Sequence, residues 1–155
     1  MLRGGIVVLA LRITNGARAD IEVLVTDGIH TGTANDAATP GSAAFSGTIG
    51  NFDVAITEST GFPAVGSPST PILDLTSLAL TSTLGGTLTL KVTETGFRTI
   101  TAAQTFLSEI TGVYVNSQAT MSTYLDAADA DFGTGKLLLT GLLDNQSALV
   151  LEPAR

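Results

Sequence analysis

Apolar and polar residues alternate along most of the chain, and Gly, Pro, Ser and Asn separate the alternating segments. Phe52, Val54 and Ile56, for example, would face one side of an extended segment while the residues between them face the other. A period of two residues is typical of a β-strand that buries one face. The pattern predicts strands at residues 20–26, 30–33, 44–50, 52–58, 72–83, 87–94, 112–124, 136–143 and 147–151.

A Gly-Gly pair at 85–86 separates two strongly alternating segments, residues 72–83 and 87–94, so we expect these segments to form a hairpin. The alternation in the first of them changes phase at residues 76–77, which predicts a β-bulge there. Residues 102–110 fit either a short helix or a strand. We therefore expect an all-β chain, a single antiparallel β-sandwich of jelly-roll-like form with at most one short helix.

The first 19 residues form a unit of their own, ahead of the β-sandwich domain that we place at residues 20–155. A basic start, a short apolar run and a small-x-small sequence resemble a secretory signal peptide that is cut before Asp20. The apolar run is too short to cross a bilayer as a helix. Arg12 and Arg18 fit this interpretation poorly, because the segment before the cleavage site is normally uncharged.

Residues 6–14 also fit a β-strand, because they are rich in β-branched and apolar residues and precede the turn-forming pair Asn15-Gly16. A strand that is apolar on both faces needs cover on both faces. It therefore lies either in the centre of its own domain or in a neighbouring subunit, which it joins as a donor strand. In the second case the subunit interface is formed by Ile6, Val7, Val8, Leu9, Leu11 and Ile13.

Composition excludes several classes of protein. The 155 residues carry 7 Lys and Arg against 14 Asp and Glu, a net charge of −7, with no cluster of basic residues. Nucleic acids and anionic membrane surfaces are therefore not expected as partners. The absence of Cys excludes disulfides and thiolate metal sites, and no apolar segment is long enough for a membrane span. The length fits one domain.

A series of strand and turn motifs runs through residues 20–143. The motifs are Thr26-Asp27-Gly28, Phe45-Ser46-Gly47-Thr48-Ile49-Gly50-Asn51-Phe52, Gly66-Ser67-Pro68-Ser69-Thr70-Pro71-Ile72-Leu73-Asp74-Leu75, Gly86-Thr87-Leu88-Thr89-Leu90, Glu94-Thr95-Gly96-Phe97, Ser122-Thr123-Tyr124 and Phe132-Gly133-Thr134-Gly135. This part of the chain resembles the secreted β-domain of uncharacterised bacterial proteins in the PEP-CTERM, exosortase-sorted group. The resemblance implies export and a role in an extracellular matrix or at the cell surface, and it implies no active site.

Proteins of that group usually end with a Pro-Glu-Pro signal, an apolar span and a basic tail. This chain instead ends with Leu-Glu-Pro-Ala-Arg at residues 151–155. We therefore expect a protein that is released or held outside the cell by assembly, rather than one sorted to a membrane. The expected localisation is extracellular or at the cell surface.

Asp126, Asp129 and Asp131 form the densest group of carboxylates in the sequence. Hard oxygen ligands that lie close together on a loop are what Ca²⁺ requires, so these three residues are the candidate calcium site. The spacing differs from that of an EF-hand loop, and a solvated acidic turn without a metal is the alternative interpretation. No other cofactor is expected.

The sequence shows no arrangement typical of an enzyme. His30 is the single histidine and no Gly-x-Ser-x-Gly motif accompanies it, which argues against a serine hydrolase and a multi-histidine zinc site. Glu58 and Glu94 end two predicted strands and would be the candidate glycosidase pair, but solvent exposure at strand ends explains them better. With no Trp and two Tyr, the chain also lacks the aromatic residues typical of sugar-binding sites.

We therefore expect a non-enzymatic structural protein that is exported and self-associates into an extracellular filament or matrix, through exchange of its N-terminal strand. The expected partners are further copies of the chain, as a homo-oligomer or polymer, and an extracellular polysaccharide. The alternative is a secreted monomeric β-module that binds a carbohydrate or calcium. A protein that decorates a virus or phage particle is also compatible with a small acidic β-domain.

Overall fold

The computed structural model describes residues 5–13, 20–67, 72–97, 108–110, 113, 115–126, 131–144 and 149–151, and in this part of the chain it contains twelve strands and no helix. The strands are β1 (Gly5–Ile13), β2 (Ile21–Thr26), β3 (Thr31–Asn35), β4 (Ser42–Ile49), β5 (Phe52–Thr60), β6 (Asp74–Leu75), β7 (Leu78–Ser82), β8 (Thr89–Phe97), β9 (Ser108–Ile110), β10 (Gln118–Asp126), β11 (Lys136–Asp144) and β12 (Leu149–Leu151). The prediction of an all-β chain is confirmed.

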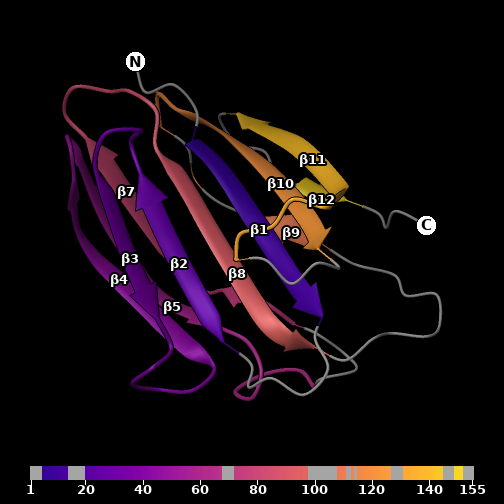
Figure 1. Cartoon of the computed structure of the whole chain (residues 1–155). Helices are drawn as coiled ribbons and strands as arrows, with labels where there is room; N and C mark the ends of the chain where they lie inside the picture. Colours follow the sequence, from indigo (N-terminus) through magenta and orange to yellow (C-terminus); the bar gives the residue numbers. More distant parts are fainter. Residues whose placement is uncertain are drawn as a thin grey trace.

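Most strands belong to two sheets that pack face to face, as in a β-sandwich (Figure 1). The larger sheet has the strand order β11-β10-β1-β8-β2-β3. The smaller sheet has the order β4-β5-β6, and β7 also pairs with β5, while β9 and β12 form a separate pair. Val92 from the larger sheet and Ile56 from the smaller sheet belong to one buried cluster, so the core lies between the two sheets.

The core follows the alternation seen in the sequence. Every second residue is buried in β2, in the first part of β5 and in the first part of β8. These residues are Ile21, Val23, Val25, Phe52, Val54, Ile56, Leu90 and Val92. Burying a side chain of this kind stabilises a protein by about 1.5–3 kcal/mol relative to leaving it exposed. The inward face of these strands is therefore the main source of stability of the sandwich.

β1 lies in the middle of the larger sheet, between β8 and β10, and it runs parallel to both (Figure 1). Leu9, for example, is the register partner of Val92 on one side and of Thr123 on the other. The other pairs of described strands are antiparallel. The strand predicted at residues 6–14 is therefore present, and it completes the sheet of its own chain. Its parallel direction is an addition to the antiparallel sandwich expected from the sequence.

β7 and β8 do not form the predicted hairpin. β7 pairs with β5 in the smaller sheet, whereas β8 pairs with β1 and β2 in the larger sheet. Gly85 and Gly86 have positive φ angles of 72° and 125°, and their segment connects the two sheets instead of closing a tight turn within one. Leu80 and Leu90 both pack into the core from opposite sheets, so alternation alone does not distinguish this crossover from a hairpin.

The predicted change of phase at residues 76–77 corresponds to a break between β6 and β7. β6 pairs with residues 59–60 of β5, and β7 pairs with residues 52–56 of the same strand. Between these pairings, Thr57 N donates a hydrogen bond to Ser77 O at 3.2 Å. The segment therefore follows β5 in two short pieces rather than as one bulged strand.

Two predicted elements in the second half of the chain differ in extent. β10 begins at Gln118, because residues 113 and 115–117 form no strand, although a strand was expected from residue 112. Residues 108–110 form β9, so the strand alternative is right for that part of the ambiguous segment. Residues 102–107 lie outside the described residues.

Candidate functional site

The predicted subunit-interface residues Ile6, Val7, Val8, Leu9, Leu11 and Ile13 all belong to β1. The β1 backbone is paired along both edges, whereas the side-chain contacts of this strand lie outside the described part of the structure. Among the described pairs, none joins β8 directly to β10. β1 is therefore the strand that unites β8, β2 and β3 with β10 and β11 in one sheet.

The three residues of the predicted calcium site differ in their surroundings. Asp126 ends β10 and is only 5% exposed, Asp131 is exposed, and Asp129 lies outside the described residues. The Asp126 carboxylate lies so close to Gly133 and Gly135 that a Cβ at either glycine would come within 3 Å of it. In the part of the chain that the structure describes, no three His, Cys, Asp or Glu side chains come together as a metal site. The calcium site at these residues stays a prediction.

A second pair of carboxylates is buried at the end of the sandwich where β2 begins. Glu94 of β8 is 0% exposed, and Asp36, which directly follows β3, is 3% exposed. Ile21 is the register partner of Glu94, and Ile21 O accepts a hydrogen bond from Asp36 N at 3.1 Å. Glu94, Ile21 and Asp36 therefore form a row across three neighbouring segments of the larger sheet.

Two loops hold these carboxylates through their backbone. Phe62 N donates a hydrogen bond to Glu94 Oε1, and Gly41 N donates one to Asp36 Oδ2 at 2.8 Å. Gly61 N donates to Gly41 O at 3.0 Å, which links the two loops. Gly61 itself packs against Glu94, since a Cβ at Gly61 would lie within 3 Å of both carboxylate oxygens. The two carboxylates and the two loops form one connected group.

Burial is the main reason why the pKa of Glu94 rises from 4.5 to about 8. The hydrogen bond from Phe62 N lowers this pKa, and the negative charge of Asp36 raises it. An ionised carboxylate in a buried site loses its hydration, which favours the protonated form. Glu94 therefore carries a proton at neutral pH when nothing else compensates its charge.

Three buried side-chain atoms in the described part of the chain have no hydrogen-bond partner: Glu94 Oε2, Ser59 Oγ and Thr93 Oγ1. Leaving such an atom unpaired costs roughly 1–3 kcal/mol. Thr93 neighbours Glu94 on β8 and therefore faces the opposite side of the sheet. Ser59 is the register partner of the core residue Ala43, and it precedes Gly61, the glycine that contacts Glu94, by two residues.

A bulge in β5 directs Ser59 inward. The register of β5 with β4 moves from the pair Ala43 and Ser59 to the pair Phe45 and Ile56, so β5 contains one more residue than β4 over this stretch. Uninterrupted alternation from Phe52 would have placed residue 58 inward instead. The bulge thus places a hydroxyl on the inner side of the sandwich, two residues before the glycine that contacts Glu94.

The only histidine lies in the turn between β2 and β3. Asp27 Oδ1 accepts hydrogen bonds from His30 N at 2.6 Å and from Ile29 N at 2.8 Å, and Asp27 Oδ2 contacts His30 Nδ1 at 2.9 Å. The hydrogen bonds from His30 and Ile29 lower the pKa of Asp27 to about 2. These contacts close a turn, and they give no support to a catalytic role for His30.

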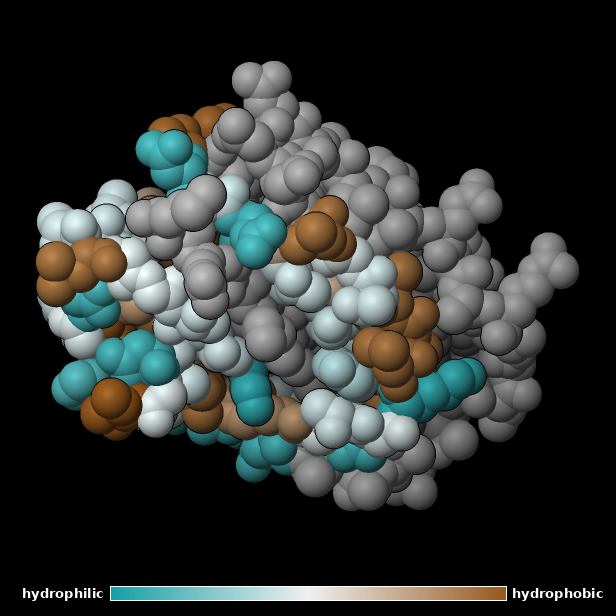
Figure 2. Space-filling view, turned by 90° about the horizontal axis from the view of Figure 1, so that it is seen from above, coloured by the Kyte–Doolittle hydropathy of each residue, from teal (hydrophilic) through white to brown (hydrophobic). Residues whose placement is uncertain are grey.

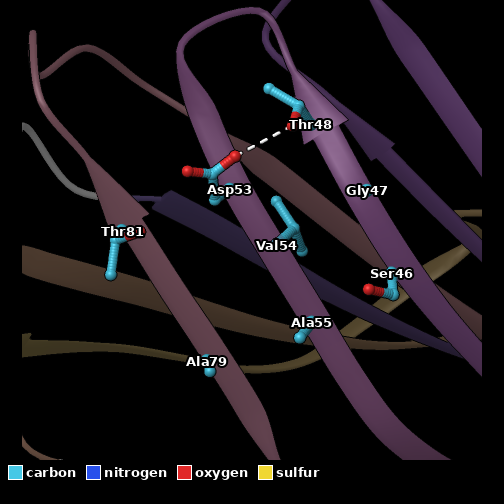
Figure 3. A pocket seen from close by; sticks show the side chains of 8 residues that line it. All are labelled: Ser46, Gly47, Thr48, Asp53, Val54, Ala55, Ala79 and Thr81. Carbon is cyan, nitrogen blue, oxygen red and sulfur yellow. Dashed lines mark hydrogen bonds between the residues drawn. The ribbon is translucent and has the colours of Figure 1, made fainter.

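A shallow groove crosses the outer face of β4, β5 and β7 (Figure 3). Its lining residues are Ser46, Gly47, Thr48, Asp53, Val54, Ala55, Ala79 and Thr81. Thr48 Oγ1 donates a hydrogen bond to Asp53 Oδ1 at 2.9 Å at one end, and the small residues Ala55 and Ala79 lie at the other end (Figure 3). None of the lining residues is aromatic, so the groove does not resemble a stacking platform for a sugar ring.

Exposed apolar side chains occur at the end of the sandwich opposite Glu94. Ile29, Leu84, Val113 and Val115 are 71–90% exposed, and they come from three separate loops. Figure 2, which looks onto this end, shows apolar residues in brown as separate groups among polar residues. Single exposed apolar side chains are normal on protein surfaces, so these groups do not by themselves define a binding site.

The structure corrects the interpretation of Glu94 as a solvated residue at a strand end. β8 continues to Phe97, and Glu94 follows Leu90 and Val92 at the next inward position. Continuing the alternation of inward and outward residues from Leu90 and Val92 would have predicted the burial of Glu94 from the sequence. The side chain of Glu58, the other predicted carboxylate, lies outside the described part of the structure. Asp36 and Ser59 had no comparable signal, because a loop and a bulge determine their positions.

No family model matches the chain, and no curated protein and no solved structure matches it either. The resemblance to the PEP-CTERM group stays a prediction. Within the described residues, no helix has the length and the apolar character that crossing a membrane requires.

Proposed function

We propose that the protein is a non-enzymatic structural subunit that self-associates outside the cell by exchange of its N-terminal strand. The central position of β1 carries the proposal. β1 forms both parallel pairs of the larger sheet, and a single connection, residues 14–19, joins it to β2. A neighbouring copy can provide such a strand in the same register and direction, as in domain swapping and donor-strand addition.

The composition of β1 supports exchange. Seven of its nine residues, Gly-Ile-Val-Val-Leu-Ala-Leu-Arg-Ile, are apolar, and β1 has partners along both edges. An exchanged strand makes the same backbone pairings as the strand it replaces. The contact energy therefore changes little, and protein concentration and the connection at residues 14–19 decide between the two forms. Reciprocal exchange closes a dimer, whereas successive exchange produces a filament.

The edge strand β11 offers a second contact between copies. Among the described pairs, β11 is bonded only to β10, and its side chains Leu137 and Leu142 are 49% and 57% exposed. An edge strand with exposed apolar side chains is a template for pairing with another chain. Lateral contacts of this kind favour a matrix over isolated filaments. The extracellular location in this proposal rests on the resemblance to the secreted β-domain.

Disulfide trapping tests strand exchange directly, because the chain has no Cys of its own. Val8 of β1 and Lys91 of β8 are register partners, so cysteines at these two positions lie within disulfide range. We would mix the single variants Val8→Cys and Lys91→Cys, oxidise them, and analyse them on a non-reducing gel. Strand exchange predicts a reducible dimer containing one chain of each variant.

The matched control places the first cysteine at Leu24 of β2 instead of at Val8. Leu24 is the register partner of Lys91 on the other side of β8. Leu24→Cys and Lys91→Cys on separate chains are not expected to cross-link, because exchange leaves β2 in its own chain. Electron microscopy of the uncross-linked protein then shows whether the assemblies are filaments. Monomers in every mixture would contradict the proposal and favour the secreted binding module.

A further inference from the structure

Glu94 combines complete burial with an oxygen that lacks a partner. Its side chain is 0% exposed, Phe62 N donates to Oε1, and Oε2 has no hydrogen-bond partner in the described structure. A buried polar atom without a partner is rare in folded proteins, and it often marks the position of an ion or a water molecule. Glu94 Oε2 is therefore the starting point for a binding site.

Ser59 provides an independent second observation. Its side chain is also 0% exposed, and its Oγ has no hydrogen-bond partner. The bulge in β5 turns Ser59 inward. Ser59 Oγ and Glu94 Oε2 are thus two unpaired oxygen atoms in the core, one from each sheet, and Gly61, two residues after Ser59, contacts the Glu94 carboxylate.

This corner becomes strongly negative when Glu94 loses its proton, because no positive side chain is described beside the two carboxylates. Asp36 is close enough for its charge to act on Glu94, and it is 3% exposed. The hydrogen bonds that the two carboxylates accept from Phe62 N and Gly41 N come from neutral backbone donors. Buried charge is costly unless it is paired or coordinates a metal. A divalent cation matches the charge of two carboxylates.

We propose that Glu94 Oε2 and Ser59 Oγ bind one Ca²⁺ ion between the two sheets, with Asp36 providing the second negative charge. The site offers only oxygen atoms, which are the ligands that calcium prefers. The loops beside the two carboxylates also bring carbonyl oxygens to this end of the sandwich, since Gly61 N donates to Gly41 O and a Cβ at Gly41 would lie 2.9 Å from Gly61 O. Each carbonyl has a second lone pair beyond the hydrogen bond that it accepts.

Calcium fits this ligand set better than other divalent cations. Ca²⁺ accepts six to eight oxygen ligands in irregular geometry, whereas Mg²⁺ demands a near-ideal octahedron. Zinc and copper prefer nitrogen and sulfur ligands, and neither His nor Cys contributes among the residues described at this corner. The ion would fasten the loops at Gly41 and Gly61 to the end of β8.

The test measures the thermal unfolding of the full chain in EDTA, in CaCl₂ and in MgCl₂ at one fixed pH. A ligand that binds only the folded state raises the melting temperature, by roughly 5–10 °C at 100-fold excess over the Kd in a chain of this size. We expect this rise with calcium and a smaller rise with magnesium. Titration calorimetry of the same protein gives the number of ions bound.

Three variants connect the response to the site. Glu94→Gln retains the shape of the side chain and should abolish the calcium response, and Asp36→Asn should reduce calcium affinity. Ser59→Ala should weaken affinity about tenfold, and it remains informative if Glu94→Gln does not fold. Asp53→Asn is the matched control, because Asp53 is an exposed carboxylate in the groove on the outer face, and it should retain the full response.

Two results would overturn the proposal. The first is an unchanged melting temperature of the wild-type protein at millimolar calcium. The second is an equal calcium response in the wild type and in both Glu94→Gln and Ser59→Ala. Loss of the response in Asp131→Asn alone would assign the ion to the acidic loop after β10 instead. The outcome does not depend on strand exchange, which the cysteine variants test separately.

Discussion

Asn51 donates a hydrogen bond from Nδ2 to the carbonyl oxygen of Gly85 at 2.6 Å, which joins the turn between β4 and β5 to the crossover between the two sheets. The same amide nitrogen donates to Ser82 Oγ at 3.1 Å, and Ser82 Oγ accepts a further hydrogen bond from Gly85 N at 3.1 Å. One side chain therefore fixes the start of the crossover that brings β8 into the larger sheet.

Asn51→Ala should lower the free energy of unfolding by about 1–2 kcal/mol, because Gly85 O and Ser82 Oγ lose a partner in a half-buried position. Chemical denaturation with urea measures the change. Asn35→Ala is the control, since Asn35 is exposed and its side chain accepts only a local hydrogen bond from Ala37 N. Equal losses in the two variants would show that the contact with Gly85 has no special role.

Gly61→Ala should destabilise the protein by about 1–3 kcal/mol, because the new methyl group would overlap the Glu94 carboxylate. The turn after β5 would have to move away from β8, and the hydrogen bond from Phe62 N would weaken. Gly47→Ala is the matched control in β4, where a Cβ would meet the Phe45 ring at an ordinary 3.6 Å. We expect that variant to be neutral or slightly more stable. The test compares the melting temperatures of the two variants. Similar melting temperatures would contradict the close packing at Gly61.

The stability of the wild-type protein in EDTA should decrease as the pH rises from about 4.5 to about 8. The pKa of Glu94 is about 8 in the folded state and 4.5 as its ordinary value, so the folded state binds an extra proton in this range. The contribution is complete below pH 4.5 and is lost as the pH rises through the folded pKa, with a total of up to about 5 kcal/mol. Glu94→Gln cannot titrate and should lack this slope. Parallel stability curves for the two proteins would be evidence against a protonated Glu94.

Asp27 should remain ionised to unusually low pH. The hydrogen bonds from His30 and Ile29 hold the pKa of Asp27 at about 2, below the ordinary 3.8. A lowered carboxyl pKa stabilises the folded state above pH 3.8, and this stabilisation is lost as the pH falls toward 2. A titration followed by NMR on the Asp27 carboxyl carbon measures the midpoint directly. A midpoint near 3.8 would mean that the turn does not hold the carboxylate in solution.

Local alternation predicted the strands well and their partners poorly. Phe52, Val54 and Ile56 are buried as expected, and the strand at residues 6–14 exists almost as predicted. The pairing of β7 with β5 and the parallel direction of β1 depend on contacts between segments far apart in sequence. A period of two indicates which face is buried, and it contains no information about which strand lies alongside.

The residues around the buried carboxylates also divide into one that alternation in the sequence could predict and two that it could not. Glu94 lies at the inward position after Val92, so a longer count along β8 would have identified it. Ser59 faces inward only because of the bulge in β5. Asp36 is buried in a loop, where its carboxylate accepts a hydrogen bond from Gly41 N. Bulges and loops are set by the packing of the complete chain. The predicted group at Asp126 and Asp131 was visible in the sequence because its members are close in sequence.

The position of β1 has a consequence for how the protein is made. Gly5 pairs with Ala119, so β1 must wait for most of the chain to be synthesised before its second neighbour exists. At typical translation rates this delay is roughly 6–23 s, and contacts of such high contact order also form slowly. If strands are exchanged as proposed, this interval is when the apolar β1 segment would dock onto β10 of another molecule. Under that proposal, the timing of synthesis and folding, as well as the final free energies, would determine whether the sheet closes within one chain or between two.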